Sequence, residues 1–418
     1  MVDVPDTATA KDRGYVVDFF DVTGGHQHDY SLHGPTGKFT ALGGTWSAPE
    51  PGTLAGPNVK VGELYDDPVR GAKDFKGSSL NYEGSGFQHL VNVQRLQSGA
   101  GDFIAEYVHD KDPNARLRIR VLPQPGQELI RAEARVSPIK YPEIVTYLIA
   151  RHVNGPGEPP LKSTFVAALE PFSTEHFITG VTREEFDGNT IVTVSRTDGE
   201  TDYIIHGTGR RALTRGSVNL GDGAEVVVVT FNAIDEPIRA FLSDGEFPVS
   251  LQVGDRKFTA TGLQGKITAL DATTGKLHVR LAAGSPTPDL TTLPGRVLHL
   301  SNPLRSTVHT ITAATRDGDD LVLTVKDALR VGLVHVDSVE GNLIHSKTAL
   351  RLFAIYRGTT LCNRADQPLA TVQEAKDTGE LTLTAPPTGK ISPGEDLWMI
   401  DATVGETVRL PAILSWSR

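Results

Sequence analysis

The sequence contains very little sulfur. Among 418 residues there are two methionines and one cysteine, Cys362. A single cysteine can form neither a disulfide framework nor a thiolate metal cluster within one chain. The cysteine count does not show whether the protein works in a reducing or an oxidising compartment, since a secreted protein need not contain disulfides.

Long apolar runs are also missing. No stretch reaches the roughly 18 apolar residues of a membrane-spanning helix, so we expect no membrane partner. The first residues lack the basic and apolar regions of a signal peptide. Either the protein stays inside the cell or the chain begins within a longer precursor, and we expect the second, with a precursor that is secreted or periplasmic.

The chain has no excess of positive charge. Its 41 lysines and arginines face 51 acidic residues, for a net charge of −10. Neutralising a phosphate backbone needs a basic field, so we expect no nucleic-acid partner. An anionic sugar remains compatible with the sequence, because a local arginine cluster can overcome a mild overall field.

Helical periodicity is nearly absent. The best helical candidate, 365–378, is short and weak. Short runs rich in β-branched and aromatic residues recur instead between turns marked by Gly, Pro, Asn and Asp. In 116–121 charged and apolar residues alternate, which is the period of a half-buried strand. The sequence therefore predicts an all-β protein of stacked antiparallel sheets.

The length of the predicted strands and the density of turn signals change near 236–248. Residues 1–240 are predicted to form one large antiparallel β-sandwich domain. Beyond it the strands become shorter and hairpin signals denser, as at 272–276 and 315–319. Residues 241–418 are therefore predicted to form one or two small β domains, either barrels or sandwiches.

The most unusual segment is a histidine cluster at 24–35, with the sequence GGHQHDYSLHGP. If the strand predicted at 15–22 continues, His26 and His28 point to one face, because alternate residues do. Two such imidazoles can share a metal or flank a substrate group. The histidines can also be ordinary polar residues at the end of a strand, hydrogen-bonded to neighbours or to water. A cupin-like metal enzyme is a further alternative, although Ser31, Leu32 or His33 stands where its acid is expected.

Three segments resemble one family. Residues 15–30, 84–90 and 163–171 are similar to the β-sandwich domain of heparinase II/III-like polysaccharide lyases, over about 14–235. The resemblance implies an N-terminal α/α toroid domain, with a uronic-acid-containing acidic polysaccharide bound between toroid and sandwich. It implies cleavage by β-elimination. The toroid is absent from this chain, so we expect little or no lyase activity from it alone.

The resemblance also implies roles for individual residues. His26 matches the substrate-facing histidine, which neutralises the carboxylate or shuttles a proton. Tyr30 is a catalytic candidate that could stand in for the toroid tyrosine, and its alternative is an ordinary packing or hydrogen-bonding residue. His28 matches the first ligand of a zinc ion, and His89 is the candidate for a later ligand. The family's second ligand, an aspartate, has no match in 41–47.

Three further residues are candidates for substrate binding. Trp46 lies on a predicted loop near the histidines and could stack on a sugar ring. Arg210 and Arg211 could hold a carboxylate or sulfate bidentately. Trp46 could instead be a loop anchor packed into the core, and Arg210 and Arg211 could lie on a solvated surface turn. The alternative function is therefore a non-catalytic carbohydrate-binding or structural β module. The sequence does not identify the glycan, and glycosaminoglycans are among the compatible substrates.

Overall fold

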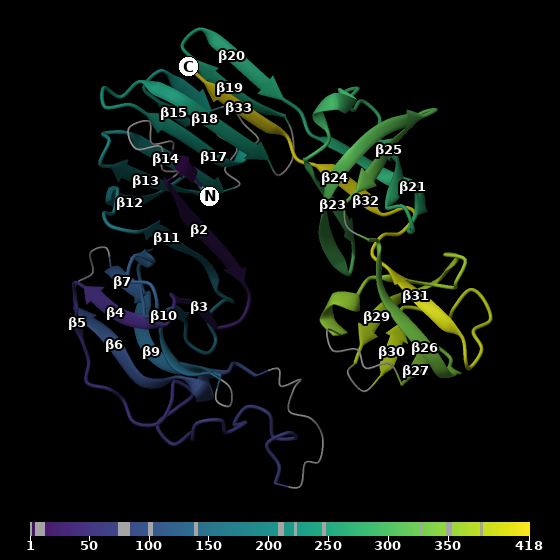
Figure 1. Cartoon of the computed structure of the whole chain (residues 1–418), viewed down its shortest axis with the longest axis horizontal. Coiled ribbons are helices and arrows are strands. Elements are labelled where there is room, and N and C mark those ends of the chain that lie inside the picture. The colour runs from purple at the N-terminus through teal and green to yellow at the C-terminus, as the bar shows by residue number, and fades with distance from the viewer. Residues whose placement is uncertain are drawn as a thin grey trace. The chain divides into compact units, whose positions relative to one another are not determined.

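The computed structural model contains no α-helix in its described part, which confirms the all-β prediction (Figure 1). The described residues are 2–4, 13–73, 84–98, 103–137, 141–207, 213–220, 224–244, 248–326, 328–347, 353–376 and 379–418. Within them we find no helical segment with the length and hydropathy that crossing a bilayer requires. The predicted short helix at 365–378 is wrong: β29 (Pro368–Ala375) is a strand with its apolar side chains in a barrel core.

The chain forms two compact units. The first contains Met1–Gly207 and Val228–Ile238, and the second contains Thr208–Val227 and Arg239–Arg418. The last segment of the first unit thus ends two residues before the predicted boundary at 240.

Two antiparallel sheets form the sandwich of the first unit. The six-stranded sheet has the order β1 (Val2–Val4), β2 (Arg13–Thr23), β11 (Lys162–Phe172), β8 (Arg116–Leu122), β7 (Phe103–His109) and β4 (Gly37–Leu42). The five-stranded sheet has the order β3 (Gln27–His33), β10 (Tyr141–Val153), β9 (Glu128–Ser137), β6 (Val91–Ser98) and β5 (Thr45–Trp46). Their facing side chains, including Tyr30, Phe103, Ile119, Leu148 and Phe165, form one core.

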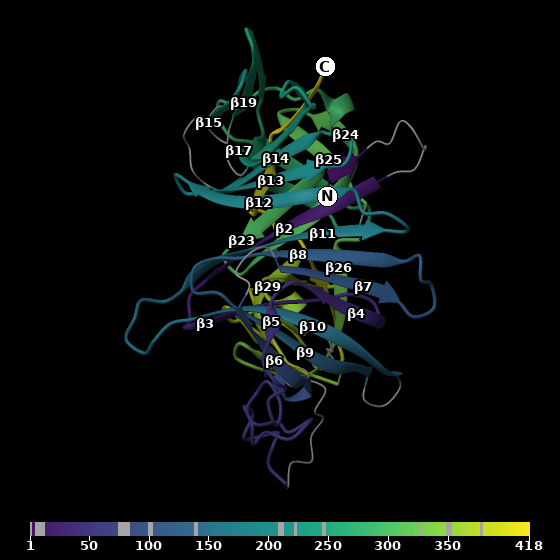
Figure 2. The ribbon, with the colours of Figure 1, turned by 90° about the vertical axis from the view of Figure 1, so that its left-hand side faces the viewer.

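Part of the six-stranded sheet, formed by β2, β11 and β8, is covered on both faces. Its second face packs on a further sheet, in the order β12 (Ile178–Phe186), β13 (Asn189–Arg196), β14 (Thr201–Gly207), β17 (Ala224–Phe231), β18 (Pro237–Asp244) and β33 (Ile413–Ser417). Figure 2 shows β12 above β11, and β10 below both. Residues 165–168 of β11 are all buried, because one face meets each neighbouring sheet.

A long connection covers the outer face of the five-stranded sheet. Leu54 and Leu90, the second of which directly follows the short 3₁₀ turn η2 (Phe87–His89), pack with Ile130 and Ile149 of that sheet. The sandwich therefore buries apolar side chains on three successive interfaces.

Two closed barrels dominate the second unit, within residues 263–410. The first barrel contains β21 (Leu263–Asp271), β22 (Lys276–Leu281), β25 (Asp320–Val325), β24 (Arg305–Asp317), β23 (Val297–Asn302) and β32 (Thr407–Leu410). The second barrel contains β26 (Arg330–Glu340), β27 (Leu343–Ser346), β30 (Glu380–Leu383), β29, β28 (Thr360–Cys362) and β31 (Asp396–Ile400). Closure leaves neither barrel with a free sheet edge.

Smaller elements complete this unit. They are the four-stranded sheet β15 (Leu213–Arg215), β16 (Val218–Leu220), β19 (Val249–Val253) and β20 (Arg256–Ala260), and the 3₁₀ turns η3 (Leu290–Thr292) and η4 (Phe353–Tyr356).

The barrels are nested along the chain. The whole second barrel is inserted between β25 and β32, and β32 returns to pair with β21 and β23. Cys362, on the second barrel, packs within the core cluster of the first. Burial, with a smaller contribution from Asp366, raises the pKa of this thiol to about 12. The cysteine is therefore a packing residue where the barrels meet.

The histidine end of the sandwich as a candidate functional site

The histidine cluster lies at a bend and not on one continuous strand. β2 ends at Thr23, and β3 begins at Gln27. Gly24 and Gly25 between them have φ values of 104° and 68°, which residues with a side chain rarely adopt. The expectation that strand 15–22 continues through His26 is therefore wrong, and His26 precedes the strand that carries His28.

The ring of His26 is exposed and held by one neighbour. Its Nδ1 lies 2.9 Å from Oδ1 of Asn154. The Asn154 amide is itself oriented, because its Nδ2 donates to the carbonyl oxygen of Pro159 at 2.6 Å. Oδ1 can only accept, so Nδ1 of His26 carries the proton. In the neutral imidazole the other nitrogen, Nε2, is then unprotonated and can act as a base.

His28 points the other way, into the space between the two sheets, and is only 4% exposed. Its Nε2 contacts the carbonyl oxygen of Gly24, and its Nδ1 lies 2.9 Å from Oγ of Ser163. Since a carbonyl oxygen only accepts, Nε2–H is the donor and Nδ1 accepts from Ser163. His28 thereby fixes the first residue of the bend that presents His26.

A second, half-buried histidine extends this hydrogen-bonded chain. His152 lies opposite His28 in the β3–β10 pairing. Its Nδ1 is 3.0 Å from Oγ of Ser163, while its Nε2 is buried without a hydrogen-bond partner among the described residues. Burial lowers the pKa of His152, and repulsion from His28 and Arg183 adds to the effect. The neutral form of His152 is thus favoured where it meets His28 and Ser163.

The described residues do not assemble the zinc site that the resemblance implies. Within the described part of the chain, no three His, Cys, Asp or Glu side chains lie close enough to hold a metal. Both nitrogens of His28 have hydrogen-bond partners. His89 is exposed on η2, which lies over the outer face of the five-stranded sheet, whereas His28 faces its inner side. We assign no chemical step to a metal.

Tyr30 is part of the core. Its ring stacks on Phe165 and Phe20, with centroids 5.7 and 5.5 Å apart. Its hydroxyl donates to Oδ2 of Asp18 at 2.6 Å. Burial, and then this contact with Asp18, raises the pKa of the phenol. The predicted catalytic role gains no support from these contacts, which are those of a packing residue.

The predicted substrate-binding residues are not brought to the histidines in the described structure. Trp46 is half-buried in β5, edge-on to Phe103 at 5.4 Å, with the Arg131 guanidinium over its ring at 5.7 Å. Its ring therefore packs against the sandwich core. Arg210 and Arg211 lie outside the described residues.

A pocket that the sequence did not reveal lies at the same end of the sandwich. Its volume is about 380 Å³, and its lining includes Lys162, Thr164 and Arg183. Lys162 pairs with Thr23, directly before the glycine bend. Arg183 donates to the Thr164 carbonyl at 3.1 Å and pairs with Glu185. The pocket places two cations at this end of the sandwich, and Glu184 and Glu185 in the same lining balance their charge.

Local sequence gave no signal for these partners. Asn154 lies 128 positions beyond His26, and Ser163 lies 135 positions beyond His28. Both contacts arise because the antiparallel β3–β10 pairing and the β2–β11 pairing bring chain-distant residues to one end of the sandwich.

Comparison with known proteins gives no family assignment. No family model matches the chain, and the curated proteins contain no match either. Functional inference therefore depends on the residues themselves.

Proposed function

We propose that this chain is the β-sheet part of a polysaccharide lyase that cleaves uronic-acid-containing glycans by β-elimination. The observation that carries the proposal is the exposed His26 ring, whose Nδ1–H is fixed by Asn154 so that Nε2 is left as a base. The complete site would need the α/α toroid of a longer secreted or periplasmic protein. The resemblance in 14–235 supports that partner.

The chemistry follows from the position of the base. Nε2 of His26 accepts the proton α to the sugar carboxylate, and the electron pair of that C–H bond forms the new double bond. The glycosidic C–O bond at the neighbouring carbon breaks, and an acid supplied by the toroid protonates the leaving oxygen. Asn154 Oδ1 then accepts from the imidazolium Nδ1–H, which stabilises the charge that forms on His26.

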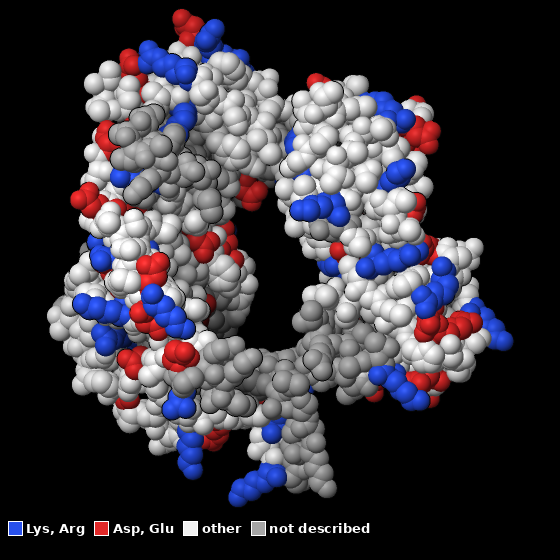
Figure 3. Space-filling view, in the orientation of Figure 1, with Lys and Arg blue, Asp and Glu red and all other residues white. Residues whose placement is uncertain are grey.

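An acidic substrate would need a cation close to His26. Figure 3 shows basic and acidic side chains interspersed over the visible face of the molecule. Selection of an anionic glycan would then depend on local cations. Lys162, which lines the pocket at this end of the sandwich, is the cation suited to a sugar carboxylate, because Arg183 already pairs with Glu185.

A non-catalytic glycan-binding module is the second candidate. It is favoured by Tyr30 and His28, whose polar atoms are already bonded within the fold. The two candidates differ in what His26 does. The module does not need His26 for affinity, whereas the lyase needs it for turnover.

The test measures the ultraviolet absorbance of unsaturated products formed from heparan sulfate or alginate. The chain alone should give little or no product, and the chain with a toroid fused ahead of it should give product. In the fusion, His26→Ala should lower kcat/KM about 100-fold or more, the usual contribution of a positioned base. His33→Ala, which removes another exposed histidine of the cluster, should change the rate less than about twofold.

Two results would count against the proposal. One is strong product formation by the chain without any toroid. The other is a fusion whose rate does not respond to His26→Ala. Unchanged glycan affinity in His26→Ala, together with the absence of product in the fusion, would favour the binding module.

A further inference from the structure

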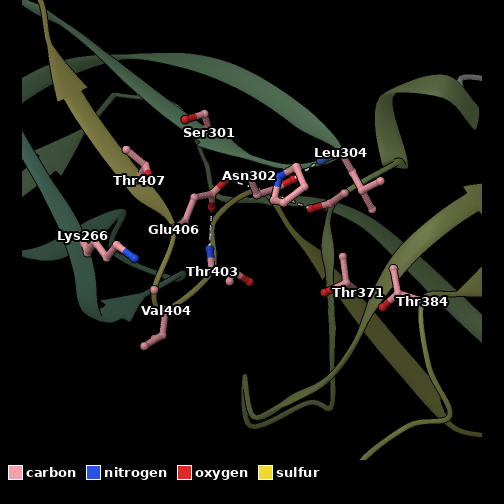
Figure 4. A pocket seen from close by; sticks show the side chains of 13 residues that line it. Lys266, Ser301, Asn302, Leu304, Thr371, Thr384, Thr403, Val404, Glu406 and Thr407 are labelled. Atoms are coloured by element: carbon pink, nitrogen blue, oxygen red, sulfur yellow. Dashed lines mark hydrogen bonds between the residues drawn. The ribbon is translucent and has the colours of Figure 1, made fainter.

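A second and larger pocket lies between the two barrels of the second unit (Figure 4). Its volume is about 760 Å³, within the range of small-molecule sites. β21, β23 and β32 of the first barrel provide one wall, and β29 and neighbouring turns of the second barrel provide another. The connection from β31 to β32, residues 403–406, completes it.

The base of this pocket is a fixed polar group. Asn302 Nδ2 donates to Oε1 of Glu406 and to the carbonyl oxygen of Gly358, both at 3.0 Å. The Thr403 amide donates to Oε2 of Glu406 at 2.9 Å. Glu406 is 5% exposed, and burial raises its pKa. Because these contacts join both barrels and the connection, the pocket is formed before any ligand arrives.

The walls offer hydroxyl groups that the fold leaves uncommitted. Ser301, Thr371, Thr384 and Thr407 line the pocket, and none of their hydroxyls has a side-chain hydrogen bond among the described residues. A hydroxyl both donates and accepts, so it complements the hydroxyl of a ligand. Figure 4 shows Thr371 and Thr384 together on one side of the hollow, with Thr407 on the other.

The charge of the lining is small and local. Lys266, an exposed residue of β21, is its cationic side chain, and the buried Glu406 is its acidic one. Lys266 lies on the side of the hollow opposite Thr371 and Thr384 (Figure 4). One cation is enough for one carboxylate, whereas a nucleotide or a highly sulfated segment needs several. Leu304 and Val404 add apolar surface that can contact the C–H groups of a ligand.

We propose that the pocket between the barrels is a binding site for a sugar acid, a small polyhydroxylated ligand with one carboxylate. The ligand carboxylate pairs with Lys266, and its hydroxyls exchange hydrogen bonds with the serine and threonine hydroxyls of the walls. The inference does not depend on the lyase proposal, since every residue of this site lies in the second unit.

The test is a titration of the full chain, labelled at its threonine methyl groups, followed by NMR. D-glucuronate should shift the methyl signals of Thr371, Thr384 and Thr407 in a saturable manner. D-glucose, which keeps the hydroxyls and lacks the carboxylate, should bind about tenfold more weakly. Acetate, which keeps the carboxylate alone, should produce no saturable shift.

Variants test the assignment of groups. Lys266→Gln should weaken glucuronate binding about tenfold and leave the weaker glucose binding unchanged. Thr371→Val, which keeps the shape of the side chain, should weaken binding of both sugars. The matched controls Lys257→Gln and Thr259→Val change exposed residues of β20 outside the pocket, and should leave affinity unchanged.

Three outcomes would overturn the proposal: no saturable shift with glucuronate, equal affinity for glucuronate and glucose, or a Lys266→Gln variant that binds glucuronate normally. Lys266 is exposed, so its replacement should leave the fold intact, which circular dichroism checks. The Lys266→Gln result therefore tests whether the pocket binds the sugar carboxylate, even if Thr371→Val fails to fold.

Discussion

Replacing Asp202 with alanine should lower the free energy of unfolding of the first unit by about 3–5 kcal/mol. Asp202 is 0% exposed and accepts three hydrogen bonds: from Tyr15 Oη at 2.6 Å, Thr230 Oγ1 at 2.6 Å and Arg196 Nη1 at 3.1 Å. The variant would leave two buried hydroxyls without this acceptor and remove one counter-charge from Arg196. The loss is large because water cannot replace the carboxylate.

The matched control is Asp198→Ala. Asp198 pairs with the same guanidinium at 3.3 Å, but its side chain is 44% exposed. Water can solvate the partners after the change, so we expect a loss below about 1 kcal/mol. Urea unfolding followed by the fluorescence of Trp46, which packs on Phe103 in this unit, measures both variants. Equal losses for the two variants would show that Asp202 does not stabilise the core as described.

Replacing Gly37 with alanine should cost about 3–5 kcal/mol, by a different mechanism. Gly37 begins β4 opposite His109, with φ of 133°, a value that residues with a side chain disfavour. An added Cβ would clash with the carbonyl oxygen of Val108 and lie 2.7 Å from the amide nitrogen of Asp110. These are backbone atoms of β7 and the following turn, so the strand pairing must shift to admit the methyl group.

Gly43→Ala separates the clash from the backbone strain. Gly43 follows the same strand and has φ of 98°, but no atom lies within 4 Å of its added Cβ. Its replacement should cost about 1–2 kcal/mol, the strain alone. Urea unfolding and amide hydrogen exchange in β4 and β7 measure the difference. A Gly37→Ala variant as stable as Gly43→Ala would contradict the close approach of β4 to β7.

The strands could be predicted because their pattern is local. In 103–109 buried residues alternate with less buried ones, and the run is rich in the β-branched and aromatic residues that favour strands. The turns expected at 272–276 and 315–319 join β21 to β22 and β24 to β25. The helix expected at 365–378 failed because its spacing of apolar residues also suits a strand with irregular pairing, and β29 has a register shift between Val372 and Glu374.

The nesting of the barrels could not be predicted. β32 closes the first barrel only after the complete second barrel, and β33 pairs with residues 239–243 of β18 after both. Such pairings depend on complementary faces far apart in the chain and leave no periodic signal within either segment. Only the presence of short strands with dense turns was available from sequence.

The candidate site was predicted in part. The sequence identified His26 and His28 as the unusual residues, but it predicted a common face for them if the strand continued, and the resemblance implied that His28 binds a metal. The two glycines between β2 and β3 turn His26 outward, while His28 remains with the inward face of β3. Asn154 begins the connection from β10 to β11, and Ser163 lies in β11 just after it. These two residues determine what the two rings can do. Their roles follow from three-dimensional contacts alone.

The claim that His26 is a solvent-facing base can be tested directly by long-range ¹H–¹⁵N NMR of the imidazole nitrogens, at a pH where both rings are neutral. The contacts predict opposite tautomers: the proton on Nδ1 in His26, bonded to Asn154, and on Nε2 in His28, bonded to Gly24. Asn154→Ala should release the preference at His26 and leave His28 unchanged. A proton found on Nε2 of His26 in the unmodified chain would contradict the claim.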